Sequence, residues 1–315
     1  MHETMQGSPL PPAATLPRLR LRHYRPRRGW GSAAFDTLNV TVLTLLCFIT
    51  FYPFYYVLIA SLSEPVALAA HQGLMLLPQG LSFEAFGRVW QNPMVRSGFA
   101  NTLFIVVGGT ALNLVLTCCG AYALSRRRLM LEKPVMLMII FTMFFTGGLV
   151  PNYLLVRDLG LLDSRWAVIL PFAVSAWNLI ILRSAFNAVP KDYEEAARID
   201  GAGDLTILTQ VYVPLCMPTL AVVAMFYAVA HWNGYFYSMI YLSDRELFPL
   251  QLVLREILVS SSTDSMMTGE AAGREALSTT IKYATVIVAT LPVLAVYPFL
   301  QRFFAKGVLV GGIKE

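Results

Sequence analysis

Residues 192–214 read DYEEAARIDGAGDLTILTQVYVP, a polar and charged segment that separates two strongly apolar runs. Taken locally, the segment predicts a short helix that begins near Pro190. Proline suits a first helical turn, and the acidic residues that follow favour the positive end of the helix dipole. Gly201 is a natural helix stop, and Asp204 is placed to cap a second segment that returns to the next apolar run.

The middle of this short helix is narrow. Ala196 and Ala197 carry small side chains between charged neighbours, so that a partner surface can approach closely. This pattern is typical of a docking helix. From the residues alone, a solvated connector with good helix propensity fits equally well.

The composition of the whole chain indicates a membrane protein. Of its 315 residues, 56% are hydrophobic and only 14% are charged, and the mean hydropathy is +0.59. Soluble domains carry about a quarter charged residues, so lipid must cover much of this surface. The net charge of +5 fits cytoplasmic anchoring and gives no reason to expect a nucleic-acid partner. The four cysteines form no CxxC or Cys/His cluster, so no metal site is expected.

Six apolar runs reach the roughly 20 residues that a helix needs to cross a bilayer. They lie near residues 36–62, 99–124, 134–156, 166–187, 213–240 and 282–304. The predicted fold class is therefore an all-α membrane protein with a six-span domain over residues 36–304. A basic arm, residues 1–35, precedes this domain, the 188–212 loop interrupts it, and a tail, residues 305–315, follows it. Glycines and prolines within the runs predict bends, among them Gly147, Gly148, Pro171 and Pro218.

The distribution of Lys and Arg predicts the orientation, because cytoplasmic loops carry an excess of these residues. Arginines are dense ahead of the first run, and Arg126, Arg127 and Arg128 follow the second. The positive residues of the outer segments 64–97 and 241–281 are thinly spread. Both termini and the 188–212 loop are therefore predicted to be cytoplasmic.

The polar segment also matches a known pattern. The order Glu195-Ala196-Ala197, three residues, Gly201, nine residues and then VYVP (211–214) resembles the EAA loop of bacterial ABC-importer permeases. The family pattern ends in Ile-x-Leu-Pro, from which Val211 and Val213 are conservative departures. The resemblance implies a type I importer permease fold in which this loop is a cytoplasmic coupling helix, held in a cleft of the ATP-hydrolysing subunit. The residues to which it gives this coupling role are Glu195, Ala196, Ala197, Arg198, Gly201 and Pro214.

Further stretches extend the resemblance over most of the chain after the basic arm. YPFYYVLIASLS (52–63), GGLVPNYLLVRDLGLLDS (147–164) and WNGYFYSMIYLS (232–243) are similar to carbohydrate importers of the maltose type. The likeness is greatest to permeases for complex oligosaccharides such as aldouronate or alginate fragments. It implies a bacterial inner-membrane protein that works with a second homologous permease, an ATPase dimer and an extracytoplasmic sugar-binding protein. The implied substrate is an oligosaccharide, with acidic ones such as alginate included.

The tail FAKGVLVGGIKE (304–315) resembles the end of the maltose-type subunit. Gly307, Gly311 and Gly312 give it a thin backbone, and the resemblance implies that it reaches between the two ATPase subunits. A frayed terminus fits these residues equally well.

The chain itself is not expected to hydrolyse ATP. Gly307 and Gly312 have P-loop spacing, but Ile313 stands where the lysine must be and no helix follows. We therefore expect this chain to bind no cofactor and to be no enzyme, with ATP and Mg²⁺ used by the partner ATPase.

Two other functional classes are disfavoured. An ion-coupled secondary transporter needs ionisable residues within its spans, and here His231 and Arg183 are almost the only ones, both near span ends. An intramembrane enzyme needs a catalytic motif such as His-Glu-x-x-His or Gly-x-Ser-x-Gly, and the sequence has neither.

Polar and aromatic residues within the spans are candidates for a sugar path, because aromatic faces pack on sugar C–H surfaces and amides bind sugar hydroxyls. They are Trp177 and Asn178 in the fourth span, and Tyr227, His231 and Asn233 in the fifth. Polar packing between helices and an interfacial aromatic belt are the commoner roles of such residues.

Overall fold

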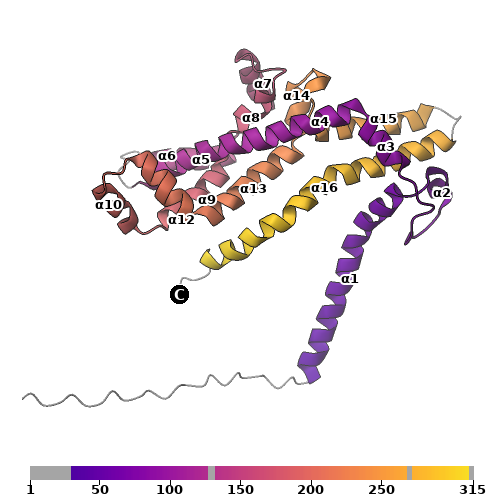
Figure 1. The fold of residues 1–315 in the computed structure, drawn as a ribbon, viewed down its shortest axis with the longest axis horizontal. Helices are drawn as coiled ribbons and strands as arrows, with labels where there is room; N and C mark the ends of the chain where they lie inside the picture. Colours follow the sequence, from indigo (N-terminus) through magenta and orange to yellow (C-terminus); the bar gives the residue numbers. More distant parts are fainter. Residues whose placement is uncertain (1–29, 127–131, 268–271, 312–315) are drawn as a thin grey trace, which may run out of the picture. The chain divides into compact units, whose positions relative to one another are not determined.

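The computed structural model describes residues 30–126, 132–267 and 272–311, and all regular structure in these residues is helical (Figure 1). The basic arm up to residue 29 lies outside the described residues. By its internal contacts the chain divides into two units, Met1–Tyr52 and Pro53–Glu315. The boundary falls inside α1 (Trp30–Ser61), at the proline that this helix contains. The described part of the first unit is one helical stretch with exposed apolar side chains, as a lipid-facing span requires.

The second unit holds the remaining elements. Its first part contains α2 (Pro65–Ala70), α3 (Glu84–Gln91), α4 (Pro93–Phe104), the π-helical turn η1 (Ile105–Gly109) and α5 (Thr110–Ser125). Next come α6 (Glu132–Phe144), α7 (Leu149–Asp158), α8 (Arg165–Ile169), the 3-10 turn η2 (Leu170–Phe172) and α9 (Ala176–Asn187). The elements after them are α10 (Lys191–Ile199), α11 (Asp204–Ile207), the π-helical turn η3 (Leu208–Tyr212), α12 (Val213–Leu215) and α13 (Met217–Asn233). The last are α14 (Phe236–Tyr241), the 3-10 turn η4 (Arg245–Leu247), α15 (Leu250–Met267) and α16 (Ala272–Gly311).

The membrane-crossing helices follow the apolar runs. Ala34–Ser61, Pro93–Ser125 and Ala276–Ala295 are each long and apolar enough to cross a membrane. Three more candidates are bent helix pairs, α6 with α7, α8–η2 with α9, and α11–α12 with α13, which turn by 113°, 51° and 89°. If each bent pair is one span, the described residues hold six, in agreement with the sequence prediction. At the sharpest bend Gly148 has φ of +84°, a left-handed conformation that a glycine adopts without strain.

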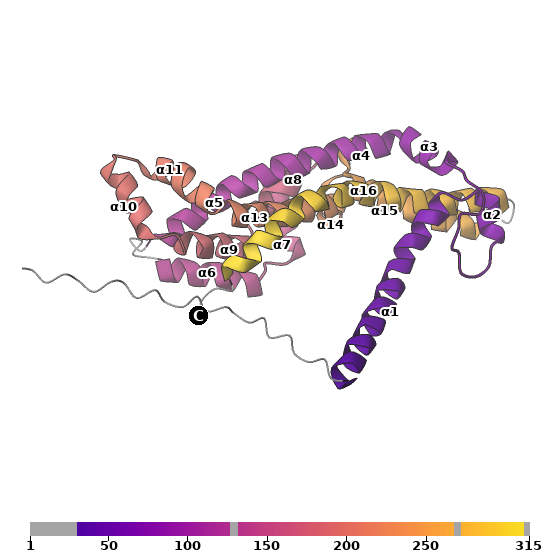
Figure 2. The ribbon, with the colours of Figure 1, turned by 60° about the horizontal axis from the view of Figure 1, so that its bottom comes forward.

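Two apolar cores are the largest of the four found among the described residues of the second unit. One is built from α5, α9, α11, η3 and α13 and includes Leu182, Phe186, Ile207 and Val223. The other joins α3, α4, α15 and α16 around Val95 and Leu250. Figures 1 and 2 show α10 beyond the ends of α5 and α9, and Figure 2 shows α11 leading back from α10 toward α5. This places the polar segment at one end of the spans.

Candidate functional site

The polar segment forms a short helix with a glycine stop. α10 follows Pro190 and carries Asp192 and Glu194 in its first turn. Gly201 has φ of +82°, the left-handed conformation in which any Cβ is strained. Its N–H donates to the Arg198 carbonyl (3.1 Å), and the next N–H, of Ala202, donates to the Ala197 carbonyl (2.9 Å). These two bonds make a Schellman stop, so the predicted helix end at Gly201 is confirmed.

The second predicted cap is wrong. The N-cap position of α11 is Gly203, and Asp204 is the first helical residue. The Asp204 carboxylate turns back to accept from Arg198 Nη2 (2.7 Å) and from the Tyr122 hydroxyl (3.3 Å). Because Asp204 lies one residue past the N-cap, its carboxylate is not at the position from which a cap accepts from the N2 or N3 N–H.

α10 presents two different faces. Glu195, Ala196 and Ile199 are exposed, the last with 86% of its surface free, and Leu205 of α11 is 73% exposed. On the other face Ala197 packs against the core of α5, α9 and η3. The helix therefore offers a small-residue and apolar surface outward while its opposite side is fixed to the spans. Pro214 lies exposed in α12, where the chain re-enters the bent span.

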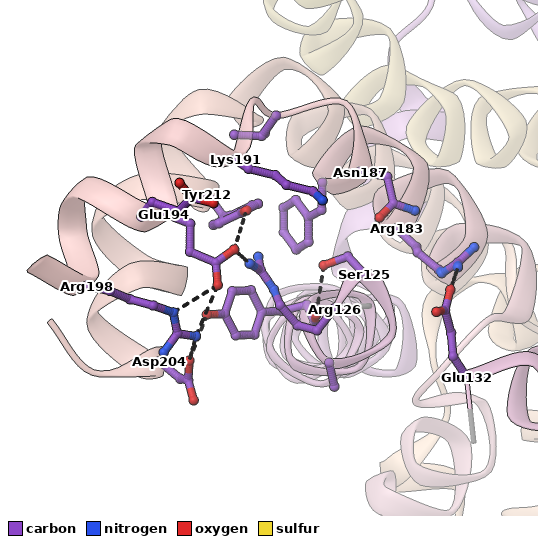
Figure 3. Close-up of a pocket in the computed structure, with 15 residues that line it drawn as sticks. Ser125, Arg126, Glu132, Arg183, Asn187, Lys191, Glu194, Arg198, Asp204 and Tyr212 are labelled. Carbon is purple, nitrogen blue, oxygen red and sulfur yellow. Dashed lines mark hydrogen bonds and ion pairs between the residues drawn. The ribbon is translucent and has the colours of Figure 1, made fainter. Parts of the chain in front are cut away.

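Glu194 is the centre of the fixed face (Figure 3). Its carboxylate accepts from Arg198 Nε (3.1 Å), from the Tyr212 hydroxyl (3.3 Å) and from Arg126 Nη1. Arg126 and Glu194 have only 16% and 17% of their side-chain surfaces exposed. A pair at this depth is less screened than a surface ion pair, and loss of one partner leaves a half-buried charge without its main counter-ion.

The Arg126 guanidinium also lies against two aromatic rings. Its central carbon lies 4.1 Å from the centroid of the Tyr122 ring and 4.2 Å from that of Tyr212. The two rings meet edge to face with centroids 5.5 Å apart, so the cation occupies the angle between them, and Phe186 contacts Tyr212 in the same way at 5.5 Å. Cation–π contacts of this kind are made more often by arginine than by lysine.

A cavity of about 1060 Å³ opens beside this network. Lys191 and Asn187 line it from the start of α10 and the end of α9. On its far side Arg183 pairs with Glu132 and donates from Nε to the Leu124 carbonyl (2.8 Å), near the end of α5 (Figure 3). Arg183 therefore ties α9 to the ends of α5 and α6, and among the described residues it makes no hydrogen bond or ion pair with α10.

Three of the predicted path residues come together at a second cavity, of about 310 Å³. Tyr227, His231 and Asn233 line it with Asn113 and Ser175. The Tyr227 hydroxyl accepts from the Ser175 N–H (2.9 Å) and bonds the Thr117 hydroxyl (2.7 Å). The Asn113 amide pairs with His231 Nε2 (2.9 Å), and in its better-satisfied orientation it accepts there and donates to the Gly109 carbonyl (2.9 Å). Aromatic rings from Phe172, Tyr235, Phe236 and Tyr237 complete the lining.

The other two path candidates lie elsewhere. Asn178 is 5% exposed and packs within the bundle, while Trp177 is 60% exposed on α9, and neither lines this cavity. The burial of Asn178 fits polar packing between helices, the commoner role of such a residue. In the predicted tail, Gly307 and Gly311 lie within α16, and Gly312 lies outside the described residues.

Sequence reasoning missed the inner side of the α10 loop. Arg126 counted only as one member of a run of basic residues, and Tyr212 only as the variable position of VYVP. Glu194 was passed over beside its neighbour Glu195. One available signal was helical spacing, because Glu194 and Arg198 stand four residues apart on α10 and pair in the structure.

Comparison with known proteins now identifies the chain. The profile of the family described as "Binding-protein-dependent transport system inner membrane component" matches residues 25–310. The chain belongs to this family. It is a permease subunit of an ABC transporter, an inner-membrane component that is itself non-catalytic, and ATP hydrolysis is the work of a separate subunit.

Individual relatives cover nearly the whole permease. It is 41% identical over 281 residues to the polygalacturonan/rhamnogalacturonan transport system permease protein YtcP of Bacillus subtilis, covering 89% of this chain and 98% of that protein. It is 37% identical over 280 residues to the protein LplC of the same organism, covering 89% and 95%. Among solved structures, a chain of a bacterial ABC transporter involved in the import of the acidic polysaccharide alginate superposes with a TM-score of 0.81 at 34% identity, covering 89% and 99%. The predicted type I permease fold and the resemblance to sugar permeases are confirmed.

Proposed function

We propose that this permease imports oligosaccharides of acidic polysaccharides, of the pectin or alginate kind, into the cytoplasm. The observation that carries the proposal is the 41% identity to a polygalacturonan/rhamnogalacturonan permease over 98% of its length. The likeness to a chain of an alginate importer supports the same substrate class.

The α10 loop supplies the contact with the ATPase. Its outward face, with Glu195, Ala196 and Ile199, is exposed and small or apolar at its centre, which suits insertion into a cleft of another protein. Within the predicted coupling set, five residues divide into three roles. Glu195 and Ala196 contact the ATPase, Gly201 sets the helix end, and Ala197 and Arg198 hold the helix to the spans.

The transport cycle follows from this contact. The loop and both termini are cytoplasmic, and a second homologous permease and an ATPase dimer using ATP and Mg²⁺ complete the complex. An extracytoplasmic protein delivers the sugar, as the family description of binding-protein-dependent transport supports. ATPase closure moves α10, and the spans alternate between inward-open and outward-open states.

The sugar path includes the cavity around Tyr227, His231 and Asn233. Its lining of aromatic rings and neutral hydrogen-bonding groups suits sugar faces and hydroxyls. A volume of about 310 Å³ is of the size that holds a single small ligand group, so one sugar ring at a time is the expected occupant.

Uptake by the reconstituted complex tests the proposal. The permease is purified with its partner subunits and binding protein, placed in proteoliposomes loaded with ATP, and offered oligogalacturonides, alginate oligosaccharides and maltose. ATP-dependent accumulation of an acidic oligosaccharide, with little of maltose, is expected. Preferential uptake of maltose would contradict the acidic class, and no ATP-dependent uptake of any sugar would contradict the import function.

A further inference from the structure

We propose that Arg126 is a positioning residue that clamps the α10 loop to the inner end of the Pro93–Ser125 span, so that a displacement of α10 is delivered to α5. The inference rests on the proposed coupling function of α10 and adds the joint through which the movement passes. It concerns three side chains, Arg126, Tyr122 and Tyr212, that the resemblance to importer permeases does not single out.

Arg126 lies just after the end of α5. The helix ends at Ser125, and Arg126 has an extended backbone (φ −87°, ψ 120°). Its side chain therefore leaves the helix end instead of continuing along the helix surface, and it reaches Glu194 of α10, 68 residues away in sequence. Figure 3 shows it between the carboxylate of Glu194 and the end of α5.

Arg126, Tyr122, Tyr212 and Glu194 together form the joint between α5 and α10. The guanidinium lies in the angle between the rings of Tyr122 and Tyr212, whose planes are 78° apart, and it pairs with the Glu194 carboxylate. Tyr122 belongs to α5 and Tyr212 to η3, so one side chain contacts three elements. A cation in this position loses a ring contact if it moves away from either tyrosine, and it loses its ion pair if it moves away from Glu194. The joint therefore resists sliding as well as separation.

Side chains also connect the C-terminal end of α10 to α5. Glu194 also pairs with Arg198, Arg198 pairs with Asp204 (2.7 Å), and Asp204 accepts from the Tyr122 hydroxyl (3.3 Å). These contacts close a ring from α5 through α10 and α11 back to α5. The backbone that links α10 to α11 passes through Gly201 and Gly203 and is a flexible connection by itself. The side-chain ring, together with the packing of Ala197 on the core, joins α10 to α5.

The distance between two spin labels, one on α5 and one just after α10, measures whether the two helices move together, and the measurement needs no sugar. Cysteines replace Ala123 on α5 and Asp200 after α10, both exposed, in a variant without the four native cysteines. In the assembled complex with its ATPase, the parent is expected to give one narrow distance that stays the same with and without ATP. Arg126→Met is expected to broaden the distribution and to shift it when ATP is added. A narrow, ATP-independent distance in Arg126→Met would overturn the proposal.

A matched control separates the clamp from general stability. Arg183→Met removes another partly buried arginine that ties neighbouring helix ends through Glu132 and the Leu124 carbonyl, and that has no hydrogen bond or ion pair with α10 among the described residues. Its distance distribution is expected to match that of the parent. If Arg183→Met broadens the distribution as much as Arg126→Met does, the effect is loosening of the whole end of the bundle and the proposal fails.

Transport supplies the second readout. In proteoliposomes supplied with oligogalacturonides, Arg126→Met is expected to lower sugar taken up per ATP hydrolysed by about tenfold or more, and Arg183→Met by less than about twofold. Arg126→Lys keeps the charge but loses the broad guanidinium that contacts both rings, so it is expected to fall between them. If the complex with Arg126→Met does not assemble, Arg126→Lys carries the test. The proposal is then overturned if Arg126→Lys has the parental distance distribution and the parental ratio of sugar taken up to ATP hydrolysed. Absence of uptake by the parent would instead count against the proposed function and leave the distance measurement to decide.

Discussion

Gly109→Ala is predicted to displace His231 and to impair the cavity that we assign to the sugar path. A Cβ built at Gly109 lies 2.7 Å from His231 Nε2, 3.0 Å from Cε1 and 3.1 Å from Cδ2. Ordinary contacts between such atoms begin near about 3.5 Å, so the imidazole must move by several tenths of an ångström or more. The ring is also paired with Asn113 at 2.9 Å, which the movement disturbs.

The cost can be worked from these contacts. Overpacking of this kind costs about 1–3 kcal/mol, and a weakened hydrogen bond costs about 0.5–1.5 kcal/mol. Replacement of a helical glycine by alanine returns up to about 1 kcal/mol. A net loss of roughly 1–3 kcal/mol in the free energy of unfolding is therefore expected from these terms.

The neighbouring glycine is the matched control. Gly108 lies in the same π-helical turn, and a Cβ there meets nothing within 4 Å. Gly108→Ala has the same change in backbone freedom without the collision, so it is expected to be as stable as the parent or slightly more stable. The difference between the two variants isolates the contact with His231.

Thermal unfolding of the purified complex and sugar uptake together make the assay. Gly109→Ala is expected to unfold several degrees below Gly108→Ala, on a scale of about 2–4 °C per kcal/mol, and to take up sugar more slowly at equal ATPase content. Equal melting temperatures and equal uptake for the two variants would refute both the close approach at Gly109 and the role of this cavity.

Further predictions concern the coupling loop, the tail and the orientation. Gly201→Ala is expected to lower the free energy of unfolding by about 1–2 kcal/mol, because φ is +82°, although a Cβ there meets nothing within 4 Å. Gly201→Asp also brings a charge to the proposed docking face and is expected to abolish uptake. Equal uptake by the two variants would show that the added charge is harmless. Glu195→Lys should uncouple ATP hydrolysis from uptake while Asp192→Lys, on the same helix, does so less, and equal effects would contradict a specific contact at Glu195. Deletion of residues 307–315 should leave insertion intact and reduce stimulated ATPase activity, and an unchanged activity would favour a frayed end. A single cysteine at position 200 should react with an impermeant reagent only in inside-out vesicles, and labelling in intact cells would reverse the predicted orientation.

The spans could be predicted because their signal is local. A run of apolar residues long enough to cross a bilayer is visible in any window of the sequence, and so are the glycines and prolines that break it. Gly148 illustrates the limit, since the sequence predicts a bend there but not that α6 and α7 turn by 113°. That angle depends on what α7 packs against, including the contact of Val156 with the buried Tyr241. Neither residue carries a local mark of this contact.

The α10 loop shows the same division between local and distant information. About ten consecutive residues encode its helix, its glycine stop and its small outward face. The structure confirms the helix and the stop. Its inner face depends on Arg126 and Tyr212, which come from two other elements. In the sequence, Arg126 is indistinguishable from the two arginines that follow it, because all three satisfy the same charge bias. In the structure α5 ends at Ser125, and the guanidinium of Arg126 lies in the angle between two tyrosine rings and pairs with Glu194. A charge pattern therefore predicts a side of the membrane, while the contact of Arg126 with α10 is visible only in the folded structure.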